Sequence, residues 1–213
     1  AIAPFDAEQA KAYQDAWAKH LGVPVEIENS IGMKFRLIPG GVYEKSPDPA
    51  EKNITAFYLS TREVVQNKFQ QIMGKNPSIT GNRGWDKPVT SITWNEAAGF
   101  CSKLSQKEQR RYRLPSSNEW EYAGLAGSAS AYYFGDDVSK LGRYAWFSGN
   151  AGPGSRNAGT KFPNAWGLFD IHGNAQEWRS DPAGAQRYIG GGSWRYPAAN
   201  CAIGPSARQP IPV

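Results

Sequence analysis

Cysteine and histidine are scarce in this sequence, and long hydrophobic runs are missing. Its 213 residues include only two cysteines, Cys101 and Cys201, and two histidines, His20 and His172. A disulfide-rich scaffold is therefore excluded, although a single bridge is not, and a metal site with three histidine ligands cannot be built. No apolar run is long enough to span a membrane, and no signal peptide or lipidation motif is recognisable. We therefore expect no membrane span in this chain.

Positive charge is in slight excess but is not concentrated. The formal net charge is +5 at pH 7, yet the lysines and arginines are scattered, and the only basic cluster is 109–113. A nucleic-acid-binding surface needs a basic stripe with aromatic residues interleaved. We therefore expect no nucleic-acid partner.

Glycine, proline and tryptophan are abundant instead. With 23 Gly, 15 Pro and 8 Trp, the chain must turn often and build its core around large aromatic side chains. The length fits one large domain with a substantial core. This composition favours an irregular α+β domain with much ordered loop. Because the first residue is Ala1 rather than Met, we expect a processed product or a module of a longer protein.

Local patterns predict several helices and strands. Residues 7–21 carry apolar residues at helical spacing, between a candidate N-cap at Asp6 and a stop signal at Gly22. Further helices are expected at 64–73, at 93–106 and from Ser116 or Ser117 onward, and strands at 33–38 and 56–60. Cys101 falls on the apolar face of the helix at 93–106, which predicts a buried thiol. Residues 127–162 show little periodicity and predict a long loop, functional or held by a ligand or ion.

Two acidic residues frame a glycine turn late in the chain. Asp170 and Glu177 lie within one short segment that also contains His172. Calcium and similar hard cations bind carboxylates together with turn carbonyls, and they avoid nitrogen ligands. A metal-bound turn is one interpretation, and an ion-free turn in which both acids accept backbone N–H groups is the other. For His172 we expect a structural hydrogen bond, because no second His or Cys lies nearby in sequence.

Three motifs carry a family resemblance. They are the segments 113–122 (RLPSSNEWEY), 164–178 (NAWGLFDIHGNAQEW) and 191–194 (GGSW). In this order and spacing they resemble the formylglycine-generating enzyme family, also called sulfatase-modifying factors. The resemblance extends from about Asn29 to Arg208. It implies an α+β, C-type-lectin-like fold with a small twisted antiparallel sheet, two main helices and long irregular loops.

The resemblance also divides the chain. We assign residues 1–28 to an N-terminal helical extension and residues 29–213 to the family domain. The family normally closes with a strand containing Gly-Phe-Arg, whereas this chain reaches Val213 without that sequence. We therefore expect the domain to lack its last strand.

The family's calcium site maps onto the glycine turn described above. The resemblance implies that the side chains of Asp170 and Glu177 and the backbone carbonyls of Gly173 and Ala175 are the ligands. We therefore expect a structural Ca²⁺ ion in this turn.

The family's catalytic cysteines are matched only in part. Family enzymes use two cysteines after the Gly-Gly-Ser-aromatic motif to bind copper(I), a soft metal suited to thiolates. The corresponding positions here are Tyr196 and Cys201, so the first cysteine is missing, while Ser193 matches the family's serine. The family's substrate-pocket tryptophan corresponds to Gln176. We therefore expect neither copper binding nor formylglycine generation, and we interpret Cys201 as buried rather than reactive.

We therefore hypothesise a divergent family member that binds a ligand in a groove near its C-terminus. The candidate ligand-binding residues are Gln176, Trp194, Tyr196, Asn200 and Arg208, because aromatic and arginine side chains supply contact area and directed donors. The alternative for Trp194 and Tyr196 is burial in the core. A protein, a peptide or a small molecule is the expected partner.

Two other functions remain open at this point. One is an oxidase of altered chemistry that uses the same groove. The other is a variable ligand-display protein of a diversity-generating retroelement, since some members of the family use the same C-terminal stretch in that way. The resemblance favours an extracytoplasmic location.

Overall fold

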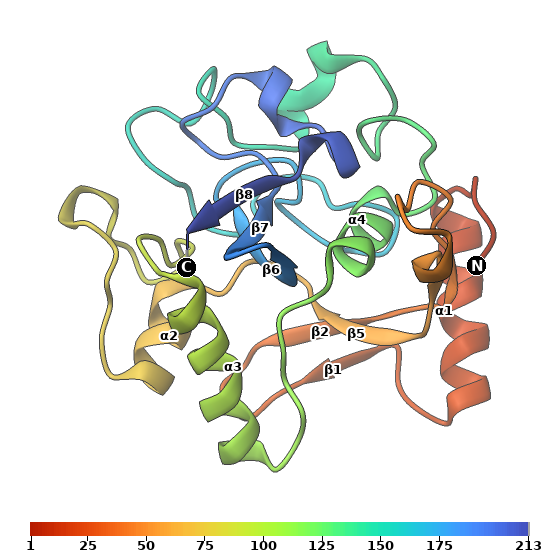
Figure 1. The fold of residues 1–213 in the computed structure, drawn as a ribbon, viewed down its shortest axis with the longest axis horizontal. Coiled ribbons are helices and arrows are strands. Elements are labelled where there is room, and N and C mark those ends of the chain that lie inside the picture. The colour runs from red at the N-terminus through yellow and green to blue at the C-terminus, as the bar shows by residue number, and fades with distance from the viewer. Residues whose placement is uncertain (213) are drawn as a thin grey trace.

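The computed structural model describes residues 1–212, and its four α-helices form close to where the sequence predicts them (Figure 1). The Asp6 carboxylate caps the first helix by accepting from the backbone N–H of Gln9, and Gly22 ends it at a φ of 66°, which glycine adopts without strain. None of the helices described is long and apolar enough to cross a membrane. The four are α1 (Ala7–Leu21), α2 (Gln66–Met73), α3 (Trp94–Glu108) and α4 (Ser117–Leu125).

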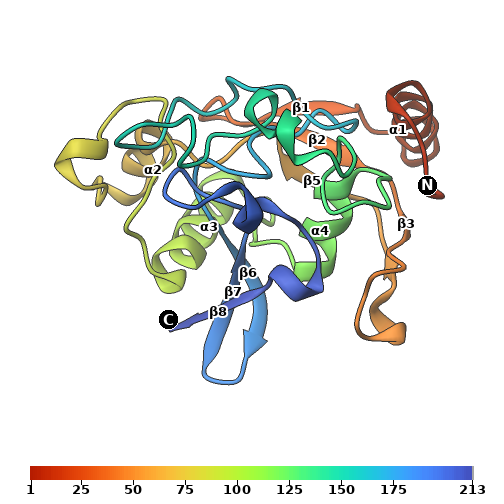
Figure 2. The same cartoon turned by 90° about the horizontal axis from the view of Figure 1, so that it is seen from above.

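The strands form small antiparallel sheets (Figures 1 and 2). The first contains β1 (Glu26–Glu28), β2 (Lys34–Ile38) and β5 (Phe57–Ser60), in the order β1-β2-β5. A second pairs β3 (Gly41–Val42) with β4 (Asn53–Ile54). A third contains β6 (Glu177–Ala183), β7 (Gln186–Gly190) and β8 (Gln209–Pro212).

Long stretches of chain join these elements. From the end of α4 at Leu125 to the start of β6 at Glu177, the only regular element is a short 3-10 helix. The predicted loop at 127–162 lies within this stretch. Small antiparallel sheets, a few packed helices and long loops make up the α+β, C-type-lectin-like fold that the resemblance implies. The 3-10 helices of the described chain are Pro49–Glu51, Thr80–Asn82, Val138–Arg143, Ala198–Cys201 and Pro205–Ala207.

No pattern in the sequence predicts strand β8, which pairs antiparallel with β7. Two of its four residues are Pro210 and Pro212, and proline cannot donate to a strand ladder, so the sequence pattern argues against a strand. β8 lies at the edge of its sheet. The two prolines stand at alternate positions, so both omit the N–H on the same side of the strand, which an edge strand tolerates when that side carries no partner.

The N-terminal segment packs closely on the rest of the domain. Ala10 of α1 is fully buried, and the buried Gln14 side chain donates to the backbone carbonyls of Leu37, at 2.8 Å, and Trp166, at 3.3 Å. β1, which lies within the predicted extension 1–28, pairs with β2 along its length. Figure 2 shows α1 against the end of the first sheet. A single amphipathic helix gains most of its stability from such packing.

Aromatic side chains dominate the core, as the composition predicts. The main cluster surrounds Trp120 and Trp166, both fully buried. A second cluster lies between α2, α3 and the first sheet, where Phe69 and Phe100 stack with their ring centroids 5.6 Å apart. A third cluster contains Cys201. These clusters bury the flat faces of large side chains, which contribute much apolar area per residue.

A buried carboxylate joins distant parts of the chain. Glu121 of α4 has no exposed surface, and it accepts from the guanidinium groups of Arg179 at 2.7 Å and Arg208 at 2.8 Å. Its second oxygen accepts from the hydroxyl of Tyr43 at 2.8 Å. Arg208 also donates to Asn118 at 2.7 Å. α4, β6, the segment before β8 and the chain beside β3 therefore meet at one anion.

We expect Glu121→Gln to lower the free energy of unfolding by about 3–5 kcal/mol, because it removes the hydrogen-bonded counter-charge of the buried Arg179. Urea denaturation followed by circular dichroism measures the change. Glu44→Gln is the matched control, since the Glu44 side chain that pairs with Lys52 is 75% exposed, and exposed pairs contribute about 0–1 kcal/mol. Equal stability of the two variants would contradict a central role for Glu121.

Candidate functional site

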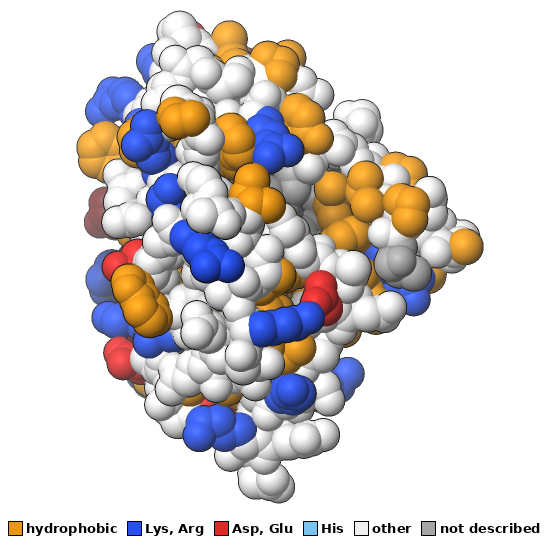
Figure 3. Space-filling model, turned by 90° about the vertical axis from the view of Figure 1, so that its left-hand side faces the viewer, with side chains coloured by type: hydrophobic (Ala, Val, Ile, Leu, Met, Phe, Trp, Pro, Cys, Tyr) orange, Lys and Arg blue, Asp and Glu red, His pale blue; other side chains and the backbone are white. Residues whose placement is uncertain are grey.

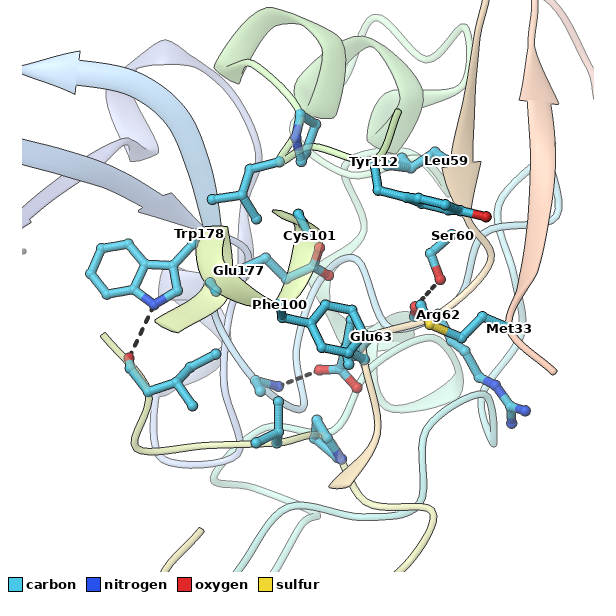
Figure 4. Close-up of a pocket in the computed structure, with 18 of the residues that line it drawn as sticks. Met33, Leu59, Ser60, Arg62, Glu63, Phe100, Cys101, Tyr112, Glu177 and Trp178 are labelled. Atoms are coloured by element: carbon cyan, nitrogen blue, oxygen red, sulfur yellow. Dashed lines mark hydrogen bonds between the residues drawn. The ribbon is translucent and has the colours of Figure 1, made fainter. Parts of the chain in front are cut away.

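A large, mainly apolar cavity lies beside the first sheet (Figure 4). It has a volume of about 870 Å³ and is enclosed by β5, α3, the segment 110–115 and the chain on either side of the start of β6. Two indole hydrogen bonds hold these walls together: Trp178 of β6 donates to the carbonyl of Ile92 at 3.1 Å, and Trp94 of α3 donates to that of Arg179 at 2.8 Å. Apolar lining residues include Met33, Leu59, Phe100, Tyr112 and Trp178.

One region of the cavity wall is acidic. Glu63 lines it and accepts from the Asn174 side chain and the Ala175 backbone N–H, each at 2.7 Å. Glu177 lines it as well and accepts from the indole of Trp120 at 2.9 Å. Burial raises the pKa of Glu63 well above its ordinary range and the pKa of Glu177 to about 7. The sequence does not predict Glu63 as a site residue, because it lies far from the motifs along the chain.

Asp170 lies close to this acidic wall. Its backbone has a φ of 60° and its side chain is buried. One carboxylate oxygen accepts from the backbone N–H of Gly159, whereas the other, Oδ1, has no hydrogen-bond partner among the described residues. Burial raises the pKa of Asp170 to about 6. The charge of Asp170 in turn contributes to the raised pKa values of Glu63 and Glu177.

The turn from Asp170 to Glu177 keeps several oxygen atoms free. Within residues 1–212, the carbonyl oxygens of Gly173 and Ala175 accept no hydrogen bond, and Oδ1 of Asp170 is unpartnered. Residues 1–212 also contain no group of three His, Cys, Asp or Glu side chains placed to hold a metal. A cation here would therefore depend on carbonyl oxygens as well as carboxylates, a mixed donor set that suits Ca²⁺.

His172 has the structural role predicted for it. The ring is fully buried, its Nδ1 lies 2.7 Å from the carbonyl oxygen of Cys201, and its Nε2 accepts from the backbone N–H of Tyr133 at 3.2 Å. This arrangement fits a neutral ring with the proton on Nδ1. Burial lowers the pKa of His172 to about 4, which keeps it neutral. The ring also stacks on Tyr133, with the centroids 4.9 Å apart.

The two cysteines lie in different clusters and are unbridged in the described chain. Cys201 is fully buried, as predicted, and burial raises the pKa of its thiol to about 12. Cys101 is only half-buried and lines the cavity, and burial raises its pKa to about 11. Reactive cysteines have depressed pKa values. Neither thiol is therefore prepared to act as a thiolate.

The predicted ligand-binding residues divide into three groups. Gln176 and Trp194 line the cavity together with Ser193. Tyr196, which is 37% exposed, and the exposed Asn200 lie on the surface beyond it. Arg208 does not line the cavity, because its guanidinium is bound to Glu121 and Asn118. The C-terminal groove of the sequence analysis is thus only partly formed, and most of the wall comes from β5, α3 and 110–115.

Comparison with known proteins gives matches across most of the chain. The sequence model of the sulfatase-modifying factor enzyme 1-like domain matches residues 28–210. The chaperone protein LppX of Paenibacillus barcinonensis is 27% identical over 218 residues, covering 74% of this chain and 77% of LppX. The inactive C-alpha-formylglycine-generating enzyme 2 of Mus musculus is 30% identical, over 50% of this chain but only 37% of the mouse protein.

Solved structures also match most of the chain. Treponema denticola variable protein 1 has a TM-score of 0.76 and 25% sequence identity, and the match covers 89% of this chain and 94% of that one. PvdO from Pseudomonas aeruginosa has a TM-score of 0.69 at 20% identity, covering 86% of this chain and 93% of PvdO, and supports the fold alone. Because the family model covers nearly the whole chain, the protein belongs to the sulfatase-modifying factor family, which includes the formylglycine-generating enzymes.

Proposed function

We propose that this protein is a ligand-binding module, which takes up a peptide, a protein segment or a small amphipathic molecule without copper-dependent cysteine oxidation. The cavity of about 870 Å³ is the observation that carries the proposal. Ligand sites have volumes of roughly 300–1,000 Å³, mostly apolar walls and a few fixed polar groups. Here the acids Glu63 and Glu177 supply such groups on one wall, and arginines line another.

The arrangement of sulfur supports binding rather than oxidation. A copper(I) site of the family type needs two thiolates close together. Tyr196 occupies the first cysteine position and is exposed, whereas Cys201 is fully buried beneath Gly192. The only other thiol, Cys101, belongs to a separate cluster of the described chain. A relative that is named a chaperone protein further favours a polypeptide as the ligand.

Cys101→Trp tests the cavity directly. The indole would extend into space that the thiol leaves open, so the anionic aromatic dye 8-anilinonaphthalene-1-sulfonate should bind at least tenfold more weakly than to the unmodified protein. Fluorescence titration measures the affinity. Cys101→Ala is the matched control and should bind the dye as the unmodified protein does. Unchanged binding by a folded Cys101→Trp variant would show that the cavity is not the binding site.

Copper chemistry gives a second test. We expect no stoichiometric copper(I) uptake in competition with a copper(I) chelator, and no oxygen consumption with cysteine-containing peptides, because burial raises the pKa of Cys201 to about 12. Cys201→Ser should behave like the unmodified protein in both assays. If the unmodified protein bound one copper and consumed oxygen, and Cys201→Ser did neither, the altered-oxidase alternative would replace the binding module.

Display of variable ligand contacts is a second candidate function. The similarity to Treponema denticola variable protein 1 favours it. The residues following the Gly-Gly-Ser-Trp motif, from Arg195 to Pro197, are exposed, as is Asn200. Such a surface accepts substitution at little cost to stability, because its side chains are not needed in the core.

Calcium binding is the structural part of the proposal. The ligands would be the side chains of Asp170 and Glu177 and the carbonyls of Gly173 and Ala175. Support comes from the unpartnered Oδ1 of Asp170 and the unused carbonyl oxygens in the same turn. Burial, and to a smaller extent the charge of Asp170, raises the pKa of Glu177, and a bound cation would relieve the repulsion between the two acids. Its chemistry would be structural, tying the turn to the acidic wall of the cavity.

Removal of calcium should therefore destabilise the protein. A ligand present at a hundredfold excess over its dissociation constant stabilises a fold by about 2.7 kcal/mol, so a chelator should lower the melting temperature, measured by scanning calorimetry. Asp170→Ala should abolish this sensitivity, whereas Asp136→Ala, which changes an exposed acid elsewhere in the long loop, should keep it. Identical melting of the unmodified protein with and without chelator would rule the ion out.

A further inference from the structure

The free edge of strand β5 faces the cavity. β5 is the last strand of the sheet β1-β2-β5, so only one of its edges is paired. Its four residues, Phe57–Ser60, all line the cavity, and Figure 4 labels Leu59 and Ser60 among the lining residues. Successive side chains of a strand point to opposite faces, so a cavity confined to one face would meet only every second residue. The cavity therefore meets β5 along its edge.

The pairing register identifies which backbone groups lie at this edge. The N–H of Thr61 donates to the carbonyl of Lys34, and Phe35 stands opposite Ser60. Residues opposite one another in an antiparallel ladder alternate between hydrogen-bonded and non-hydrogen-bonded pairs. Leu59 therefore bonds to β2, whereas Tyr58 and Ser60 direct their N–H and C=O groups away from it. These four polar groups have the spacing of the hydrogen-bonding groups along one edge of an antiparallel strand.

The pairing of β1 with β2 confirms which residues of β5 bond to β2. The N–H of Leu37 donates to the carbonyl of Val25 on the β1 side of the sheet, so Leu37 does not bond to Tyr58, the residue opposite it on β5. Tyr58 and Ser60 also make no backbone hydrogen bond with loops of the described chain. A row of unpaired backbone groups at a sheet edge is a template for pairing with another chain.

Besides the acids Glu63 and Glu177, the cavity that this edge faces is lined by exposed arginines. Arg62 lies in the loop after β5, two residues beyond Ser60, and Arg110 and Arg111 lie on the wall formed by 110–115. All three line the cavity, are exposed, and form no ion pair among residues 1–212. Arg113 on the same wall is already paired with Glu119 at 2.6 Å. An occupant that carries carboxylates would complement the three unpaired arginines.

We propose that the cavity receives an extended, acidic and apolar segment of a partner polypeptide, which pairs with β5 as an additional strand. This inference rests on the proposed function and names its ligand class. Addition of a strand to a sheet edge gives affinity through main-chain hydrogen bonds and specificity through pockets for alternate side chains. Alternate apolar side chains of the segment enter the cavity, and its acidic residues lie beside Arg110 and Arg111. An aliphatic anion would contact the apolar wall and pair with the arginines, but it would not form strand hydrogen bonds with the backbone groups of Tyr58 and Ser60.

Backbone methylation of a probe peptide tests the strand pairing. The probe is selected from a library of acetylated eight-residue peptides with Glu at both ends and alternating Val, Leu and Thr between them, by fluorescence polarisation. The best binder is then N-methylated at every second amide, in two versions that block opposite edges. We expect one version to bind at least tenfold more weakly and the other to change by less than about threefold. Amide exchange of Tyr58 and Ser60 should slow when the probe binds.

Charge reversal of a cavity arginine is the second test of the proposal. Arg111→Glu should weaken the probe at least tenfold, whereas Lys107→Glu, an exposed change on α3 outside the cavity, should not. Equal binding by both methylated versions would overturn strand pairing, and so would binding of oleate with no binding by any library peptide. If the cavity still binds the aromatic dye in either case, the proposed function survives. If the dye does not bind either, both the strand pairing and the proposed function are contradicted.

Discussion

The buried carboxylate of Glu121 fixes how the parts of this domain meet. It is the shared acceptor for Arg179 of β6, Arg208 before β8 and Tyr43. A buried anion that loses a partner costs several kcal/mol, so moving any of these segments away from α4 is unfavourable. The guanidinium of Arg179 also lies 4.1 Å from the ring centroid of Trp120. The charge network and the main aromatic core are therefore one structure.

The cavity depends on this arrangement through the adjacent residue of α4. Trp120 precedes Glu121 and donates to Glu177 at the start of β6. The network that positions β6 thus also positions the acidic wall. Glu63 is held separately, by Asn174 and Ala175. Acids that burial would otherwise disfavour are retained because the scaffold supplies donors to each of them, and this leaves a polar wall in a mainly apolar space.

Sequence reasoning succeeded where the signal is local. The caps at Asp6 and Gly22 follow from residue types within one turn of helix, and the burial of Cys201 follows from its apolar neighbours. Arg208 is the opposite case. Its residue type predicts a ligand contact because arginine favours binding sites, whereas its bond to Glu121, 87 residues away, is indicated by no local pattern. For the same reason the sequence does not predict the cavity wall, since β5, α3 and 110–115 carry no shared motif and become neighbours only through the fold.

The same physics separates what this scaffold must keep from what it can change. The long loop between α4 and β6 is anchored by side chains that bond to backbone, as Asn164 does to the carbonyl of Ala123 and Asn174 to that of Arg156. These anchors hold the loop in position although it contains little regular secondary structure, and Glu121 holds the segments around α4. Tyr196 and Asn200 are exposed, so a substitution at either position costs little stability. The cavity is lined by other residues, chiefly those of β5, α3 and 110–115, so substitutions at these two exposed positions leave the cavity formed.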